Sequence, residues 1–342
     1  MNQVDMAASS AWQQRLVQAV IATLGLVAIV GSGGGGEGAN CSFWSDTCEP
    51  EFGPIPPIPS ATIGPQRVAV QVGGTLVFRV QSNLLQPIYG WCRLPAGGSA
   101  CTEIAGATSD QYTLAGANLT DDGATFWVTV TGSNGSATAS SRVAVSSMPG
   151  VAFEDGEFLE PSWALSSVVS PSDNPPTFSA TRAAAGGHPD AFRTATYDFA
   201  SVPSSVRTYY GALSAVYDPA VQGAIYVIDF AEDCLHGGDS NLLSYTGPMI
   251  EQAGRRFVAA RAAVYCLATT WSAVRRASLD ASDFELVEGP ACGAGESCPD
   301  FSSNGAPVRL GLMAGADLSG GLVPPVRTSH GFDNWKVAVW RR

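Results

Sequence analysis

From residue 67 onward the chain alternates between apolar and polar positions with a period of two, the period of a β-strand that is buried on one face. Gly, Pro, Asn and Asp residues interrupt this alternation every several positions, as turns do between short strands. Over residues 67–147 the pattern predicts a two-sheet sandwich. The expected core positions are Val68, Val70, Leu76, Phe78, Val80, Trp91, Phe126, Val128 and Val130.

Residues 150–342 continue as short predicted strands between Gly, Pro and Asp turns, and no segment keeps a helical period for more than a turn or two. So many short strands in one block indicate a large jelly-roll sandwich. The sequence therefore predicts an all-β protein, in which a smaller sandwich precedes a larger one. The strands expected in the larger sandwich span residues 192–199, 205–210, 223–230, 255–266, 283–288 and 307–313.

The first 32 residues contain the longest apolar run, residues 16–30, which follows Arg15 and precedes Gly31 and Ser32. The run is shorter than the ~20 residues that cross a bilayer, and its order of basic, apolar and small regions is that of a secretory signal peptide. An uncleaved N-terminal anchor is the alternative, because Asp5 offsets the charge of Arg15. The run also resembles a bacterial lipoprotein leader, but Ser32 occupies the place of the lipidated cysteine, so we do not predict lipidation.

Residues 33–66 are rich in Gly and then in Pro, which predicts a linker that is flexible at first and extended later. An even number of cysteines, eight, accompanies the predicted export signal, so we expect disulfides formed in an oxidising compartment. A zinc site is disfavoured, because there is no C-x-x-C pair and the chain has only three histidines. Proximity along the chain favours the pairs Cys41–Cys48, Cys92–Cys101, Cys234–Cys266 and Cys292–Cys298.

Residues 67–148 carry several motifs that resemble bacterial immunoglobulin-like domains. These motifs are Ile88-Tyr89-Gly90-Trp91, Tyr112-Thr113-Leu114 and the run from Asp121 to Val130. The resemblance implies that Trp91 is the core tryptophan of strand C and that Asp122-x-Ala124-x-Phe126 leads into strand F. Phe78 and Val128 stand where the family has its inter-sheet cysteines, so apolar packing should replace that disulfide.

The two ends of residues 150–342 resemble the paired terminal strands of concanavalin-like and carbohydrate-binding jelly rolls. The motifs are Phe153-Glu154-Asp155-Gly156 at the start and Phe332-Asp333-Asn334-Trp335 near the end. The resemblance implies that the first and last strands lie side by side, and that a structural calcium ion could bridge them through Glu154 and Asp333. Neither acidic segment has the spacing of an EF-hand, so plain surface carboxylates are the alternative reading.

The net charge of the chain argues against some classes of binding partner. Asp and Glu number 30 against 18 Lys and Arg, a formal net charge of −12, which argues against nucleic acid and anionic membrane surfaces. We therefore expect no nucleic-acid partner, and membrane contact only through an uncleaved N-terminal segment. With 45% apolar and 14% charged residues, most of the chain should fold.

No motif predicts a catalytic residue. The nearest match to the Glu-x-Asp-x-x-Glu pattern of laminarinase-type glucanases has Asp229 and Glu232 in place, but Val227 stands where the nucleophile is needed. There is no Gly-x-Ser-x-Gly elbow, and we expect the histidines His188, His236 and His330 to be surface groups in loops.

Aromatic rings that stack on sugar faces are the remaining candidate chemistry. Trp335 and Trp340 should face opposite sides of one strand, with Trp335 in the core. We interpret the chain as an exported, noncatalytic envelope protein of a bacterium, secreted, periplasmic or at the cell surface, whose larger sandwich binds a glycan or another surface protein. A polysaccharide-acting enzyme and a purely structural spacer are the alternatives. The candidate ligand-binding residues are Trp163, Tyr209, Tyr210, Tyr245, Trp271 and Trp340.

Overall fold

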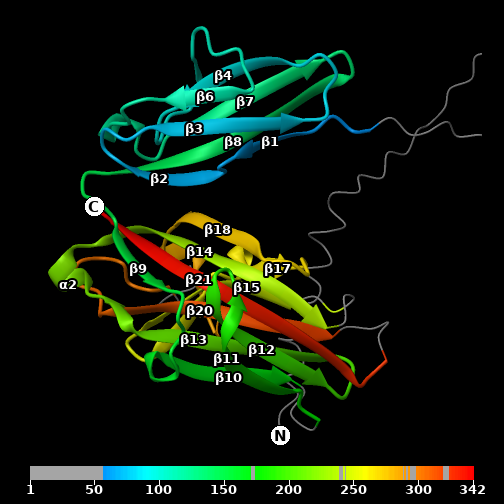
Figure 1. Cartoon of the computed structure of the whole chain (residues 1–342). Helices are drawn as coiled ribbons and strands as arrows, with labels where there is room; N and C mark the ends of the chain where they lie inside the picture. Colours follow the sequence, from blue (N-terminus) through cyan, green and yellow to red (C-terminus); the bar gives the residue numbers. More distant parts are fainter. Residues whose placement is uncertain are drawn as a thin grey trace, which may run out of the picture. The chain divides into compact units, whose positions relative to one another are not determined.

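The computed structural model describes two β-sandwiches in succession (Figure 1). The described residues are 57–170, 174–238, 242, 244–287, 289, 292, 298–318 and 323–342. The predicted signal or anchor of residues 1–32, most of the linker of residues 33–66, and the pair Cys41–Cys48 lie outside them. Within the described ranges, no helix is long and apolar enough to cross a membrane.

The N-terminal sandwich has the strand order of an immunoglobulin-like domain. One sheet has the order β1-β3-β6 and the other β2-β8-β7-β4-β5, and β2 runs parallel to β8 while the other strand pairs are antiparallel. The strands are β1 (Ala61–Gly64), β2 (Arg67–Gln71), β3 (Leu76–Ser82), β4 (Ile88–Leu94), β5 (Thr102–Glu103), β6 (Gln111–Leu114), β7 (Thr125–Gly132) and β8 (Gly135–Ser146).

The core of this sandwich forms around Trp91, as the sequence predicts. Trp91 is 1% exposed, and its indole N–H donates to the Ser109 carbonyl at 2.9 Å. The rings of Phe78 and Phe126 stack with centroids 5.1 Å apart, and Phe78 and Val128 are both fully buried where a disulfide would otherwise join the sheets. Apolar burial therefore takes the role of that disulfide.

The C-terminal sandwich is a larger jelly roll of two antiparallel sheets. The seven-stranded sheet has the order β10-β13-β20-β15-β16-β19 with β17 added beside β15, and the six-stranded sheet has the order β11-β12-β21-β14-β18 with β9 added beside β21. The longest strands are β13 (Ser204–Tyr217), β14 (Ile225–Gly238), β20 (Val308–Leu318) and β21 (Val326–Arg341). The others are β9 (Val151–Asp155), β10 (Trp163–Ser170), β11 (Thr177–Gly187), β12 (Asp190–Phe199), β15 (Ser244–Gln252), β16 (Arg255–Val258), β17 (Val264–Cys266), β18 (Ser272–Leu279) and β19 (Glu285–Leu286).

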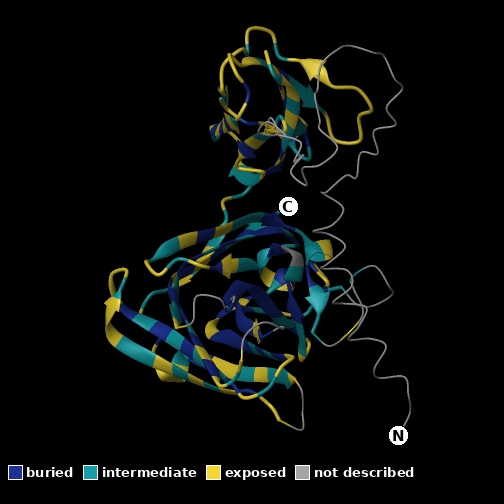
Figure 2. Ribbon diagram, turned by 90° about the vertical axis from the view of Figure 1, so that its right-hand side faces the viewer, coloured by how far each residue is buried: buried dark blue, intermediate teal, exposed yellow. Residues whose placement is uncertain are grey.

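The first and last strands of this sandwich pair with each other, which confirms the expectation from its two terminal motifs. In the antiparallel pair of β9 and β21, Phe153 lies opposite Val337 and Asp155 lies opposite Trp335. Trp335 is buried in the core, and Trp340 lies on the other face of β21, as predicted. Figure 2 shows the resulting alternation of buried and exposed stretches along the strands.

Three of the predicted disulfides are present. Cys92 pairs with Cys101, Cys234 with Cys266, and Cys292 with Cys298. The second of these is buried in the C-terminal core, where both cysteines are 1% exposed. Three disulfides indicate a protein that folds in an oxidising, extracellular compartment.

Candidate ligand-binding site on the C-terminal sandwich

A β-bulge in β21 reshapes the outer face of the six-stranded sheet. Lys336 lies opposite Ala231 of β14, but Asp333 lies opposite Asp233, so β21 has one residue more than its partner between these pairs. Asn334 sits in the bulge with φ +49°, a left-handed conformation that asparagine tolerates better than most residues. The bulge lets Phe332 and Trp335 both face the core.

The turn between β11 and β12 folds over this bulge. The Asp333 carboxylate accepts hydrogen bonds from the backbone N–H groups of His188, at 2.5 Å, and of Asn334, at 2.6 Å. The Asn334 side-chain amide donates to the His188 carbonyl and, at 2.9 Å, to Asp233 Oδ2. Burial raises the pKa of Asp333, although the two backbone donors oppose that effect.

Asp233 lies at the centre of the polar part of the site. Its Oδ2 is 3.1 Å from His188 Nδ1, and its Oδ1 is 3.8 Å from an Arg275 guanidinium nitrogen. The Asp233 side chain is only 10% exposed, whereas the side chains of His188 and Arg275 are 66% and 61% exposed. A bound molecule would therefore meet the imidazole and the guanidinium first, with the carboxylate behind them.

Trp271 provides an apolar surface beside these polar groups. A methyl group placed on Gly331 would lie 3.3 Å from the far edge of the Trp271 ring, so glycine allows the ring to lie close against β21. The Trp271 indole N–H donates to the Gly186 carbonyl at 3.1 Å, and the ring meets Phe192 edge-to-face at 5.3 Å. Trp271 nevertheless remains partly exposed. We call His188, Phe192, Asp233, Trp271, Arg275 and Asn334 the bulge site.

Four of the six candidate aromatic residues are buried, which corrects the prediction that they offer ring faces to a ligand. Trp163 and Tyr210 are 5% and 0% exposed in the main core. Tyr209 and Tyr245 belong to a smaller cluster with Met249, Val258 and Met313, and the Tyr245 hydroxyl accepts from Arg207 Nε at 3.1 Å. Packing against neighbouring strands occupies these rings.

Trp340, the sixth candidate, is partly exposed but is held differently from Trp271. Its indole N–H donates to Asp229 Oδ2 at 2.8 Å, and a methyl group placed on Gly150 would lie 3.5 Å from its ring. Of the predicted aromatic residues, the structure brings Trp271 alone together with exposed polar side chains of the bulge site.

The two candidate calcium ligands do not converge. Glu154 lies opposite Lys336 and forms an ion pair with it at 3.0 Å, while Asp333 is fully buried under the His188 turn. Calcium takes six to eight oxygen ligands, and the described residues contain no group of three or more acidic, histidine or cysteine side chains arranged to hold a metal. The residues do not fit calcium, and we derive no role for it.

The carboxylates of the glucanase-like pattern point to opposite faces of β14, because they are three positions apart on one strand. Asp229 accepts from the Ser278 backbone N–H at 2.6 Å on the outer face, and burial raises its pKa. Glu232 faces the core and is fully buried. Asp229 and Glu232 therefore cannot flank one glycosidic bond.

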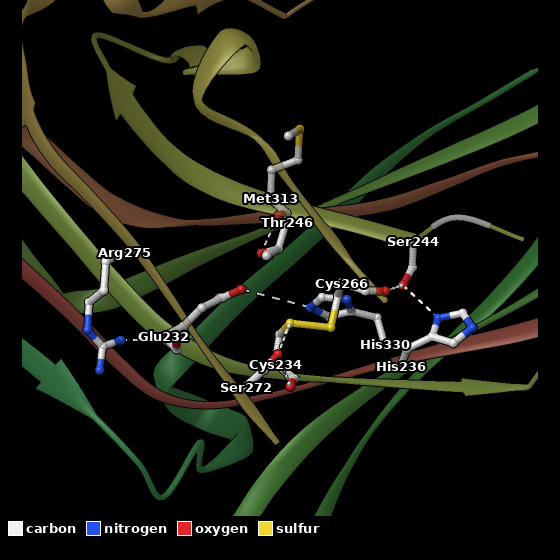
Figure 3. Close-up of a disulfide and its surroundings, with 10 residues drawn as sticks. All are labelled: Glu232, Cys234, His236, Ser244, Thr246, Cys266, Ser272, Arg275, Met313 and His330. Carbon is white, nitrogen blue, oxygen red and sulfur yellow. Dashed lines mark hydrogen bonds and ion pairs between the residues drawn. A yellow bond between two sulfur atoms is a disulfide. The ribbon is translucent and has the colours of Figure 1, made fainter. Parts of the chain in front are cut away.

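The expectation of three surface histidines is wrong for two of them. His236 and His330 lie opposite each other on β14 and β21 and are 4% and 0% exposed. Figure 3 shows them beside the Cys234–Cys266 disulfide, where His236 Nδ1 is 3.1 Å from Ser244 Oγ. His188 is exposed in a turn, as expected.

Sequence reasoning missed most of the bulge site, namely His188, Phe192, Asp233, Arg275 and Asn334. One signal was present in the sequence. In a regular strand, Phe332 and Trp335, which are three positions apart, would face opposite sides of the sheet, although both are large apolar residues. A change of phase inside a strand is what a bulge produces.

Comparison with protein-family models found no match, and comparison with curated proteins found none either. Among solved structures, the N-terminal four Ig domains of Dscam1 isoform 6.9 match with 22% identity over 25% of this chain and 20% of that chain, at a TM-score of 0.21. A marsupial T cell receptor matches with 8% identity over 44% of this chain and 92% of that chain, at a TM-score of 0.22. This chain spans about a fifth of the length of the Dscam1 structure. These likenesses carry no argument about function, and the immunoglobulin-like assignment rests on the strand order.

Proposed function

We propose that the chain is an exported, noncatalytic binding or adhesion protein of the bacterial cell envelope, and that its C-terminal sandwich binds a glycan at the bulge site. The observation that supports this most is the position of Trp271, a partly exposed indole fixed by Gly186 and Gly331 next to exposed Arg275 and His188. A sugar presents an apolar C–H face to such a ring and hydroxyl groups to neighbouring polar side chains.

The bulge site suits a neutral or hydroxyl-rich ligand better than a strongly charged one. Arg275 and His188 both face Asp233, so the carboxylate partly balances the positive charge of Arg275. A guanidinium and a carboxylate in the same place can donate to and accept from the vicinal hydroxyls of a sugar ring. The N-terminal sandwich then serves as a spacer that holds the binding sandwich away from the cell surface.

A glycan array probed with the full chain tests the proposal. We expect binding to a restricted group of glycans that is lost in the variant W271A and kept in W340A, the matched control with its indole N–H bound to Asp229. Binding to no glycan would favour the structural spacer instead. Turnover of a polysaccharide would favour the enzyme, and binding that survives W271A would place the ligand elsewhere.

A further inference from the structure

The core of the C-terminal sandwich contains two ionisable side chains that face each other. Glu232 of β14 and His330 of β21 are both 0% exposed, and Glu232 Oε1 lies 3.9 Å from His330 Nε2. Neither the carboxyl oxygens of Glu232 nor the ring nitrogens of His330 make a hydrogen bond to any described residue. Figure 3 shows the two side chains pointing toward one another from neighbouring strands.

Strand alternation places these groups where apolar side chains would be expected. On β14, Phe230 and Cys234 flank Glu232 on the core face, and on β21, Phe332 follows His330 on that face. A charged carboxylate in such surroundings is destabilised unless it is paired and fully hydrogen-bonded.

The other polar and ionisable groups around the pair have hydrogen-bond or ion-pair partners elsewhere, or they lie outside the core. His236 contacts Ser244 Oγ, and Thr246 Oγ1 donates to the Met313 carbonyl at 3.0 Å. Asp233 is on the outer face of β14, where Arg275 donates to the Glu232 carbonyl at 3.2 Å rather than to its carboxyl group. The buried Arg193 pairs with Glu160 at 3.0 Å, and the disulfide between β14 and β17 has no charge.

Burial decides the charge state of both groups. It raises the pKa of Glu232 to about 8, although the Thr246 side chain opposes this effect, and Asp233 adds to it. It lowers the pKa of His330 to about 3, and the neighbouring His236 adds to this effect. Between these values the carboxylic acid and the imidazole are both neutral, and the acid lies 3.9 Å from a ring nitrogen of the imidazole.

We propose that Glu232 and His330 form a neutral acid–imidazole pair inside the sandwich, with the acidic proton held on Glu232, and that loss of this proton to alkaline solvent loosens β14 from β21. The pair is then a pH-sensitive latch between two adjacent strands of the six-stranded sheet. Deprotonation leaves a carboxylate next to a neutral imidazole in an apolar core, so the strands must separate or admit water to solvate it.

Infrared spectroscopy of protein labelled with ¹³C at the glutamate side-chain carboxyl tests the proposal. We expect the C=O band of a protonated glutamate at neutral pH, which disappears as the pH rises past about 8. The band should be absent in E232Q and unchanged in E154Q, because Glu154 is exposed and paired with Lys336. The label excludes Asp229, Asp317 and Asp333, whose pKa values burial also raises.

A spectrum without a protonated glutamate at neutral pH would overturn the proposal, because it would mean that Glu232 is an ionised partner of a charged His330. A band that persists in E232Q would also overturn it. If E232Q does not fold, the titration of the labelled wild-type chain decides alone: disappearance of the band together with increased hydrogen exchange in β14 and β21 supports the latch, and disappearance without increased exchange contradicts it.

Discussion

Replacing Glu232 by Gln should change how the stability of the C-terminal sandwich depends on pH. The pKa of Glu232 is raised from 4.5 to about 8 on folding. The folded state therefore binds this proton more tightly than the unfolded state, and the stabilisation is complete below pH 4.5 and lost as the pH rises through about 8. His330 acts in the opposite sense: its pKa falls from 6.5 to about 3, so its stabilisation is lost as the pH falls between these values.

The size of the effect follows from the difference between the two pKa values of Glu232. A difference of about 3.5 units, at 1.36 kcal/mol per unit, corresponds to about 5 kcal/mol of unfolding free energy between the acidic and alkaline limits. Glutamine keeps the size of the side chain and can donate its amide N–H to His330, but it does not ionise. Stability of E232Q should therefore be flat from about pH 7 to alkaline pH, while His330 still lowers it below about pH 6.5. At about pH 9 it should exceed that of the wild type by several kcal/mol.

Urea unfolding at about pH 5, 7 and 9 measures this difference, and hydrogen exchange of β14 and β21 assigns it to the C-terminal sandwich. The control variant E154Q should follow the wild type, since Glu154 is exposed. Parallel stability profiles for the wild type and E232Q would refute the reasoning, because Glu232 would then have the same pKa in the folded and unfolded states.

Further predictions concern packing, crosslinks and the bulge site. Trp91→Ala should destabilise the N-terminal sandwich by about 3–5 kcal/mol, and W127A, which truncates a tryptophan that is 38% exposed, by much less; equal losses in chemical unfolding would contradict the assigned core. Removing Cys234–Cys266, 32 residues apart, should cost about 4 kcal/mol, against about 3 kcal/mol for Cys92–Cys101, 9 residues apart; urea midpoints in the reverse order would argue against loop closure as the cause. Gly331→Ala should weaken ligand binding about tenfold by pushing the Trp271 ring off β21, and an unchanged affinity in calorimetry would show that this contact is unimportant. Calcium should leave the melting temperature unchanged, because Glu154 is paired with Lys336; a rise would reinstate the calcium site.

The fold could be predicted to the extent that each strand buries one face. The N-terminal sandwich follows from alternation around Phe78, Trp91 and Val128, all of which are in its core. In the larger sandwich, the strands β10, β11, β15 and β18 were missed. The example of β15 shows why: Gly247 and Pro248 interrupt its sequence like a turn, yet Pro248 lies opposite Leu312 within the sheet.

The site was harder to predict than the fold, because it depends on contacts between strands distant in the sequence. Trp271 was among the candidates, but nothing in its local sequence distinguishes it from the buried Tyr209 or Tyr210. The turn at His188 reaches Asp233 and Asp333 only because β21 bulges at Asn334. Likewise, the sequence predicts a turn at His330 because Gly331 and Asp333 lie beside it, whereas pairing with β14 buries His330 in the core.

Isothermal titration of the strongest glycan from the array into the wild type, W271A and W340A tests the central claim most directly. The account predicts that W271A loses at least about tenfold in affinity, or about 1.4 kcal/mol, while W340A binds as the wild type does. Wild-type affinity in W271A, with the loss in W340A instead, would contradict the assignment of ligand binding to the bulge site.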